Sequence, residues 1–398
     1  MFKGLGSDVK FIILDDDQLA YHSPLPPGDV TALQELLRES NSFVPSFVGA
    51  DVYSVETYIV QYARRRIETT LLFDRNLYSQ ALALAKGTRA TETSRFAAAV
   101  MAFASCANAQ IEPNLALYEG SASGAHRAWK RDLEVFHRSD EIHPANWAAL
   151  ALGYAERFDR RIPGKRLRSG PAKSFDPTAK LRFYGFVYPI VLKMATISRV
   201  GGQSDKKIIE LLDWMYYRWH FSAPATVLAI QALSHNPPKD IFKNIGSTDR
   251  KKALAGVRNA AWDLVYITAW YEKIKTQAQK HELTVLCSRD RVLLTAAERL
   301  RSAVFDGTMP PFEKAGFGRS ALRRYNSYVS DLSNPKRALT PFPADFEDYR
   351  NKLIAELESE FRTPLCGGNV NSPHKQRVIT SCLPTTRSEP PTRSPVTR

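Results

Sequence analysis

Residues 69–73 read TTLLF and are followed directly by Asp74, Arg75 and Asn76. A short apolar and β-branched run without alternation is typical of a strand buried on both faces of a parallel sheet. In such a sheet, the carboxyl ends of the strands form the crevice in which ligands bind. The stretch therefore predicts an α/β fold, and it makes Asp74 the first candidate site residue.

A second stretch has the same form near the other end of the chain. Residues 283–287 read LTVLC and are followed by Ser288, Arg289 and Asp290. We expect this run to be another strand of the same sheet, with Asp290 at its carboxyl end. Both Asp74 and Asp290 could also serve as helix N-caps, a common role for aspartate after a strand.

A third apolar run lies at the start of the chain. Residues 9–14 read VKFIIL and lead into Asp15–Asp17, so we expect a strand here as well. These three acids are a rival to Asp74 as the first acidic group of the site. They lack an asparagine two positions on, however, and the sequence LPPG at 25–28 interrupts the place where a helix would begin.

Most of the remaining chain has the apolar spacing of helices. Glu92 opens one of them, where its charge complements the helix dipole. The tryptophans and tyrosines of residues 214–219 follow a helical stripe, so we expect them in the core rather than in a binding site. The expected helices cover residues 91–107, 208–219, 253–280 and 344–361.

Composition and charge bound the class of protein. The 398 residues are 44% hydrophobic and 24% charged, as in a soluble globular protein. No apolar run is long enough to cross a bilayer, no secretory leader is apparent, and the four cysteines are widely spaced, so we expect a cytoplasmic protein without membrane contact. The net charge of +14 favours a polyanionic partner, above all nucleic acid.

The positive charge is concentrated between residues 157 and 182. This segment holds nine basic and two acidic residues, with Phe158 and Phe175 between them. Such a patch can bind phosphates and stack bases, although a solvated loop has the same composition. The candidate nucleic-acid-binding residues are Arg160, Arg161, Lys165, Arg166 and Arg168.

Two further acids stand in apolar surroundings. Asp263 lies within the helical stretch WDLVYITAW, where it is either a buried site residue or an ordinary helix acid that faces solvent or pairs with Arg258. Glu119 follows Pro113, a residue that favours a helix start. Glu112 would share the face of Glu119 if the segment between them were one helix.

Four of these stretches together resemble the acidic motifs of PIN-domain nucleases. TLLFDRNLYS resembles the opening motif of the family, EPNLALYE the second, WDLVYITAW the third and TVLCSRDRVL the fourth. The four stretches follow one another along the chain in the same order as the motifs of that family. The spacing of 144 positions from Glu119 to Asp263 exceeds that of a compact PIN domain, and we interpret the excess as a helical insertion.

The resemblance implies a PIN-like three-layer fold, with a short parallel sheet flanked by helices. The implied nuclease core comprises residues 67–124 and 251–310, interrupted by a helical insertion at 125–250. An acidic extension at 1–66, in which nine acids face three bases over the first 60 residues, precedes this core. A helical segment at 311–362 follows it, and the tail at 363–398 has the composition of a disordered chain.

The resemblance also implies a function. Asp74, Glu119, Asp263 and Asp290 would be the catalytic and metal-binding residues, holding Mg²⁺ or Mn²⁺, with Asn76 and Ser288 orienting ligands or water. The activity would be that of an endoribonuclease, either a toxin or an RNA-processing factor. An inactive PIN-like RNA-binding or scaffold protein and a structure-specific DNA nuclease are the alternatives. The expected partner is RNA, then DNA, and an antitoxin or a second copy of the chain are further candidates.

Overall fold

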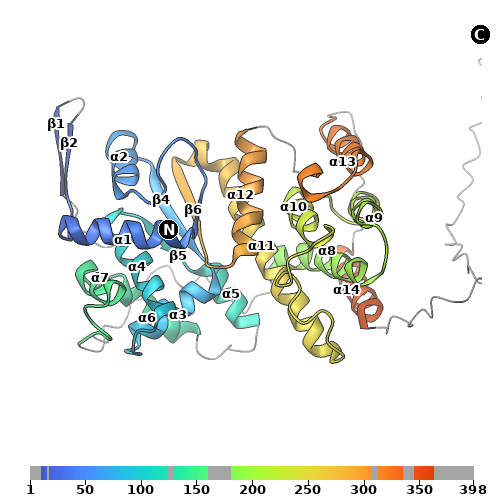
Figure 1. The fold of residues 1–398 in the computed structure, drawn as a ribbon, viewed down its shortest axis with the longest axis horizontal. Coiled ribbons are helices and arrows are strands. Elements are labelled where there is room, and N and C mark those ends of the chain that lie inside the picture. Colours follow the sequence, from blue (N-terminus) through green and yellow to red (C-terminus); the bar gives the residue numbers. More distant parts are fainter. Residues whose placement is uncertain are drawn as a thin grey trace, which may run out of the picture. The chain divides into compact units, whose positions relative to one another are not determined.

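A computed structural model describes residues 10–15, 18–122, 129–159, 181–306, 312–334 and 345–362 (Figure 1). The sheet strands are β3 (Phe43–Pro45), β4 (Glu68–Phe73), β5 (Gln110–Glu112) and β6 (Glu282–Cys287). They are hydrogen-bonded in the order β3-β6-β4-β5. The fold is therefore mixed α/β, and most of it is helical.

The two apolar runs that precede Asp74 and Asp290 are neighbouring strands. The predictions for residues 69–73 and 283–287 are confirmed by β4 and β6, which pair in parallel with Leu71 opposite Val285. β5 pairs in parallel with β4 on its other side. The prediction of a purely parallel sheet is wrong, because β3 pairs antiparallel to β6. The loop after β3 thus leads away from the edge at which β4 and β6 end.

Helices cover both faces of the sheet. The side chains of Leu71 and Phe73 pack into one apolar core, whereas Leu72 packs into another on the opposite face. The first core is closed by α1 (Pro27–Ser40), α3 (Arg75–Ala85) and α4 (Glu92–Cys106). The second is closed by α11 (Arg250–Lys280) and α12 (Arg291–Phe305). Burial on both sides explains why these strands lack alternation.

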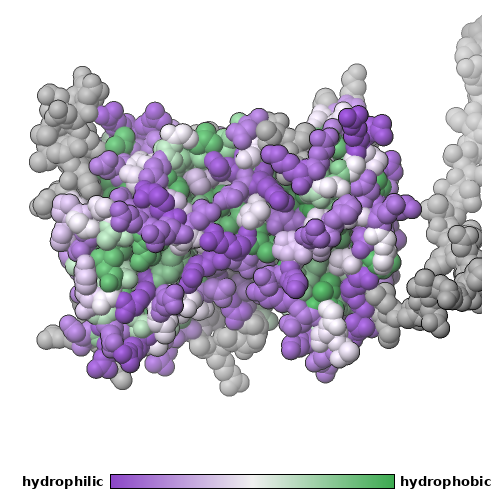
Figure 2. Space-filling model, viewed as in Figure 1, coloured by the Kyte–Doolittle hydropathy of each residue, from purple (hydrophilic) through white to green (hydrophobic). Residues whose placement is uncertain are grey.

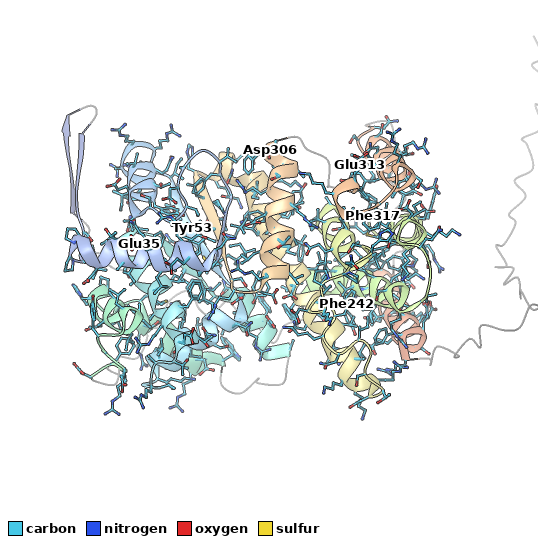
Figure 3. All side chains as sticks on the ribbon, viewed as in Figure 1. Glu35, Tyr53, Phe242, Asp306, Glu313 and Phe317 are labelled. Atoms are coloured by element: carbon cyan, nitrogen blue, oxygen red, sulfur yellow. The ribbon has the colours of Figure 1, made fainter. Side chains whose placement is uncertain are left out.

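The aromatic residues of the first core fix the edge strand. Phe43 of β3 stacks on Tyr53 with their ring centroids 5.2 Å apart, and the Phe43 N–H donates to the Tyr53 hydroxyl at 3.2 Å. Tyr53 is labelled in Figure 3 between α1 and the strands. It precedes α2 (Val55–Arg65), which leads directly into β4.

The strand predicted at residues 9–14 does form, but not in the expected sheet. It is β1 (Lys10–Asp15), which pairs antiparallel with β2 (Gln18–His22) in a separate two-stranded sheet. Asp15 ends this hairpin strand, which is not a neighbour of β4 or β6, and Asp16 and Asp17 lie outside the described residues. The described part of the rival site therefore does not follow a strand of the main sheet.

The four helices predicted from apolar spacing are confirmed. Thr91 caps α4 with a capping box that includes Ser94, as the position of Glu92 in the first turn suggested. The long helix predicted at 253–280 is α11, which Asp249 caps through the N–H groups of Lys251 and Lys252. The other two are α9 (Ser204–Arg218) and α14 (Phe346–Arg362).

Every described element between residues 129 and 250 is helical, and these helices belong to two cores. α6 (Trp129–Ser139) and α7 (Pro144–Leu152) pack with α3 and α4. The others, α8 (Arg182–Arg199), α9 and α10 (Ala223–Ala232), pack around α11. α5 (Asn114–Ala122) lies directly after β5 and packs on α3.

The helices around α11 form a core of their own, against which the aromatic residues of 214–219 pack, except Tyr217, which is exposed and for which the expectation is wrong. Trp214 and Trp219 are buried here, as expected. Phe242 and Phe317, labelled in Figure 3, are buried in the same core. The last helices, α13 (Arg319–Leu332) and α14, pack on α9 and α8 respectively, and a 3₁₀ turn at Glu313–Ala315 precedes α13.

The face of the molecule in Figure 2 is covered mostly by hydrophilic side chains. Within the described ranges, no helix combines the length and the apolar character needed to cross a membrane. The five basic residues predicted to bind nucleic acid, from Arg160 to Arg168, lie outside the described residues, as does the tail from residue 363.

Candidate functional site

Asp74 and Asp290 occupy equivalent positions on neighbouring strands. Each directly precedes a helix and caps it: Asp74 Oδ1 accepts the Leu77 N–H at 2.7 Å. Asp290 Oδ1 accepts the N–H groups of Val292 and Leu293 at 2.9 and 3.2 Å. The capping role is therefore real for both residues. It occupies Oδ1 in each case, which leaves Oδ2 of both carboxylates for other partners.

Ser288 joins the two aspartates. Its hydroxyl donates to Asp74 Oδ2 at 2.5 Å and accepts the Asp290 N–H at 2.9 Å. Ser288 is fully buried, and its own N–H donates to the Ser42 carbonyl at the end of the neighbouring loop. The serine thus has no freedom to turn away, and it holds Asp74 in a fixed orientation beside Asp290.

Asp74 and Asp290 line one pocket of about 450 Å³. Asn76 also lines it, from the first turn of α3, as the candidate role of this residue requires. Further residues of α3 and α4 also line it, together with Arg289. The complete lining is Asp74, Asn76, Leu77, Gln80, Thr93, Phe96, Arg289 and Asp290.

Glu119 lies behind Asp74 on α5, in buried surroundings. Its Oε2 accepts a hydrogen bond from the Tyr266 hydroxyl at 3.1 Å, and its Oε1 lies 3.7 Å from a guanidinium nitrogen of Arg75. Burial raises the pKa of Glu119 to about 7; Arg75 and Tyr266 counteract this shift, whereas repulsion from Asp74 adds to it. Glu119 does not line the pocket that contains Asp74 and Asp290.

The interpretation of Glu112 as a helical neighbour of Glu119 is wrong. Glu112 ends β5, and Pro113 separates it from α5, so the two carboxylates do not share a helix face. Glu112 instead accepts the Asn114 N–H at 2.9 Å and helps to start α5. The seven positions from Glu112 to Glu119 thus contain the end of a strand, a proline and the start of a new helix.

Asp263 points toward the same region from α11. Burial raises its pKa well above the ordinary value, and repulsion from Asp290, Glu119 and Asp74 adds to this effect. The alternative that Asp263 pairs with Arg258 is wrong, because Arg258 contacts Glu358 of α14 at 3.1 Å. Lys243 is the basic residue whose charge favours ionised Asp263.

The four predicted carboxylates thus lie near enough to influence one another's pKa values, although they do not form a single tight cluster. Burial also raises the pKa of Asp74, with a contribution from Asp290, while the Ser288 and Leu77 hydrogen bonds oppose it. Within the described part of the chain, no three acidic, histidine or cysteine side chains converge closely enough to hold a metal ion. Only Asp74 and Asp290 of the four line the pocket.

Sequence reasoning missed several residues of the site. Arg289 and Tyr266 stand inside the motifs already quoted, so their position beside the acids was a usable signal. Thr93 and Phe96 had no such signal, because they come from the next helix, α4, and reach the pocket only through tertiary packing.

The chain was compared with protein families, curated proteins and solved structures. No family model, curated protein or solved structure matches this chain. The arrangement of the site residues is therefore what bears on its function.

Proposed function

We propose that this chain is a divalent-metal-dependent endoribonuclease that hydrolyses phosphodiester bonds of RNA. One observation carries the proposal. Asp74 and Asp290, at the carboxyl ends of adjacent parallel strands, are bridged by Ser288 and line a common pocket. The resemblance of the four acidic stretches to PIN-domain nucleases, in the same order along the chain, supports the same activity.

The donor set suits a hard cation. Carboxylate oxygens favour Mg²⁺ or Mn²⁺ over zinc. Asp74 and Asp290 would hold the ion, because they line the pocket, and the bound cation would favour ionisation of the nearby Glu119 and Asp263, whose pKa values burial raises. Gathering four carboxyl groups, of which Asp74 and Glu119 are buried and Asp263 and Asp290 half-buried, is costly, and a cation offsets that cost. When bound, the ion would activate water and stabilise the negative charge that develops on the phosphodiester.

The chain's own residues would position the reactants. Ser288 fixes the carboxylate of Asp74, and helix capping fixes that of Asp290, so both present a preorganised oxygen to the pocket. The Asn76 amide lies beside them and can orient water or the substrate. Cleavage by this family implies a 5′-phosphate and a 3′-hydroxyl product, as expected of a toxin or an RNA-processing factor.

A second candidate is an inactive PIN-like protein that binds RNA without cutting it. The spread of the carboxylates favours it, since no three of the described metal-ligating side chains form a tight group. The two candidates share the same fold and differ only in whether the pocket supports hydrolysis. A structure-specific DNA nuclease is a third candidate, in which the same acidic residues would act on a different substrate.

The deciding experiment compares Asp290→Asn with Asp249→Asn. Asp249 caps α11 in the way that Asp290 caps α12, with two N–H groups at 2.9 and 3.2 Å, but it lies outside the pocket. Asparagine caps helices as well as aspartate does, so both variants should fold. We expect D290N and D74N to lose Mn²⁺-dependent cleavage of single-stranded RNA by at least about 100-fold while RNA binding persists. D249N should cleave like the wild type.

Two results would overturn the proposal: cleavage that persists in D74N and D290N, or cleavage that resists EDTA. Binding of RNA without any cleavage by the wild type would instead establish the inactive protein. Parallel assays on single-stranded RNA, duplex DNA and flap DNA separate the RNA and DNA nucleases, because faster turnover of a DNA substrate would identify the third candidate.

A further inference from the structure

The pocket that the two aspartates line also contains a positive charge that the proposed chemistry has not used. Arg289 lies between Ser288 and Asp290 in the sequence, and its guanidinium lines the same pocket. The backbone on either side of it is fixed, since Ser288 is hydrogen-bonded to Ser42 and Asp74 and the Asp290 N–H is bonded to Ser288. The base of the side chain is therefore rigidly placed.

An aromatic ring also holds the outer end of this side chain. The Arg289 guanidinium carbon lies 5.5 Å from the ring centroid of Phe96. Phe96 is buried in α4, so its ring is a fixed surface on which the guanidinium rests. Such a contact orients an arginine while leaving its in-plane N–H donors free for a planar or tetrahedral anion.

Arg289 shares its pocket with two carboxylates but does not pair with either of them. Within the described ranges, no carboxylate lies within 4.0 Å of its guanidinium, although Asp290 is the next residue and Asp74 lines the same pocket. Thr93, in the first turn of α4, lines the same pocket, so the positive end of a helix dipole lies at it. The pocket thus combines carboxylates suited to a cation with a guanidinium suited to an anion.

We propose that Arg289, with Thr93 beside it, holds the phosphate that neighbours the scissile phosphate of a single-stranded RNA. This inference rests on the proposed function for the identity of the RNA, while the anion site itself rests on a guanidinium that lines the pocket and pairs with no carboxylate of the described residues. A pocket volume of about 450 Å³ is in the range of pockets that take small ligands, so the proposal names a single strand rather than a base-paired helix as the substrate. Arg289 is a positioning residue for the substrate, and it takes no part in the transfer of protons or electrons.

The test compares Arg289→Gln with Arg291→Gln. Arg291 lies two residues away, is exposed, donates to the Asn41 carbonyl at 3.2 Å and does not line the pocket, so both variants lose the same charge in the same neighbourhood. The first measurement is binding of a fluorescein-labelled single-stranded RNA in EDTA, where hydrolysis does not occur. We expect R289Q to weaken binding about tenfold and to reduce the slope of log Kd against log salt by about 0.7. R291Q should match the wild type, and Arg289→Lys should restore the slope because the charge returns.

The second measurement is cleavage with Mn²⁺. We expect the KM of R289Q to rise about tenfold with kcat within about threefold of the wild type. A fall in kcat without a change in KM would overturn the positioning role, and equal binding and salt slopes for R289Q and R291Q would overturn the phosphate contact. If no variant and no wild type cleaves but R289Q still weakens binding, the anion site stands and the hydrolytic function fails.

Discussion

Ser288 at the end of β6 donates a hydrogen bond to the carboxylate of Asp74 at the end of β4, across a separation of 214 residues in the sequence. Parallel pairing of the two strands makes this contact, since Phe73 and Cys287 lie opposite each other in the register. The next residues of both strands therefore emerge at the same edge. The candidate site is a direct product of this pairing.

The bridge itself can be tested with Ser288→Ala. The change leaves Asp74 Oδ2 and the Asp290 N–H without their partner in a buried position, which typically costs about 1–3 kcal/mol of unfolding free energy. We expect S288A also to cut RNA more slowly, because Asp74 is no longer held in place. Urea unfolding and cleavage rates measure the two effects.

The matched control for that change is Ser46→Ala. Ser46 is equally buried and its hydroxyl accepts the Thr284 N–H of β6 at 2.9 Å, but it does not touch Asp74. We expect S46A to lose stability to a similar extent while its cleavage rate is unchanged. Equal cleavage by S288A and S46A would show that the Ser288 bridge is structural only.

Glu119 should make the stability of the protein depend on pH. Burial raises its pKa to about 7 in the folded state, so the folded protein binds a proton that the unfolded chain releases above its ordinary pKa of 4.5. This contribution to stability is complete below about pH 4.5 and is lost as the pH rises through about 7. In the wild type, we expect the unfolding free energy to fall by on the order of 2–3 kcal/mol between pH 4.5 and pH 8 because of this group. Glu119→Gln, which keeps an acceptor for Tyr266, should remove that decrease.

Urea unfolding in EDTA at a series of pH values measures this difference. Glu112→Gln is the control, because Glu112 is partly exposed at the end of β5 and its amide would still accept the Asn114 N–H. E112Q should follow the pH dependence of the wild type. If the unfolding free energy of E119Q depends on pH as that of the wild type does, Glu119 is not the group responsible.

Metal binding can be measured without reference to catalysis. A ligand that binds only the folded state stabilises it, by about 2.7 kcal/mol at one hundred times its Kd. We expect Mn²⁺ to raise the Tm of the wild type by about 5 °C, since a kcal/mol shifts the Tm of a large domain by a few degrees. D74N should lose this shift and D249N should keep it, because Asp249 lies outside the pocket. An equal shift in all three would place the ion elsewhere.

A glycine fixes the loop that brings Lys243 toward Asp263. A Cβ atom at Gly256 of α11 would lie 1.7 Å from the carbonyl oxygen of Lys243, so Gly256→Ala must displace that backbone. We expect G256A to lose about 1–3 kcal/mol of unfolding free energy, as overpacked sites do. Gly246→Ala is the control, because a Cβ atom there meets no atom within 4 Å. Similar melting temperatures for the two variants would contradict the close packing of Gly256 against the Lys243 carbonyl.

The sequence by itself determined the elements that carry the site. The runs before Asp74 and Asp290 are apolar without alternation because helices cover both faces of the sheet, so the strand β4 and its partner β6 could be predicted locally. The same signal failed for β1, because a hairpin strand and a sheet strand of six residues share one composition. The helices followed from apolar spacing, which burial imposes wherever a helix packs on a core.

Only the tertiary structure decided which residues meet. Strand register places Ser288 beside Asp74, and α4 brings Phe96 to the pocket that Arg289 lines, and neither relation leaves a trace in local sequence. The break at Pro113 separated Glu112 from Glu119, although their spacing fitted one helix. Local patterns record how each segment is buried, whereas distances between segments depend on how all of them pack at once.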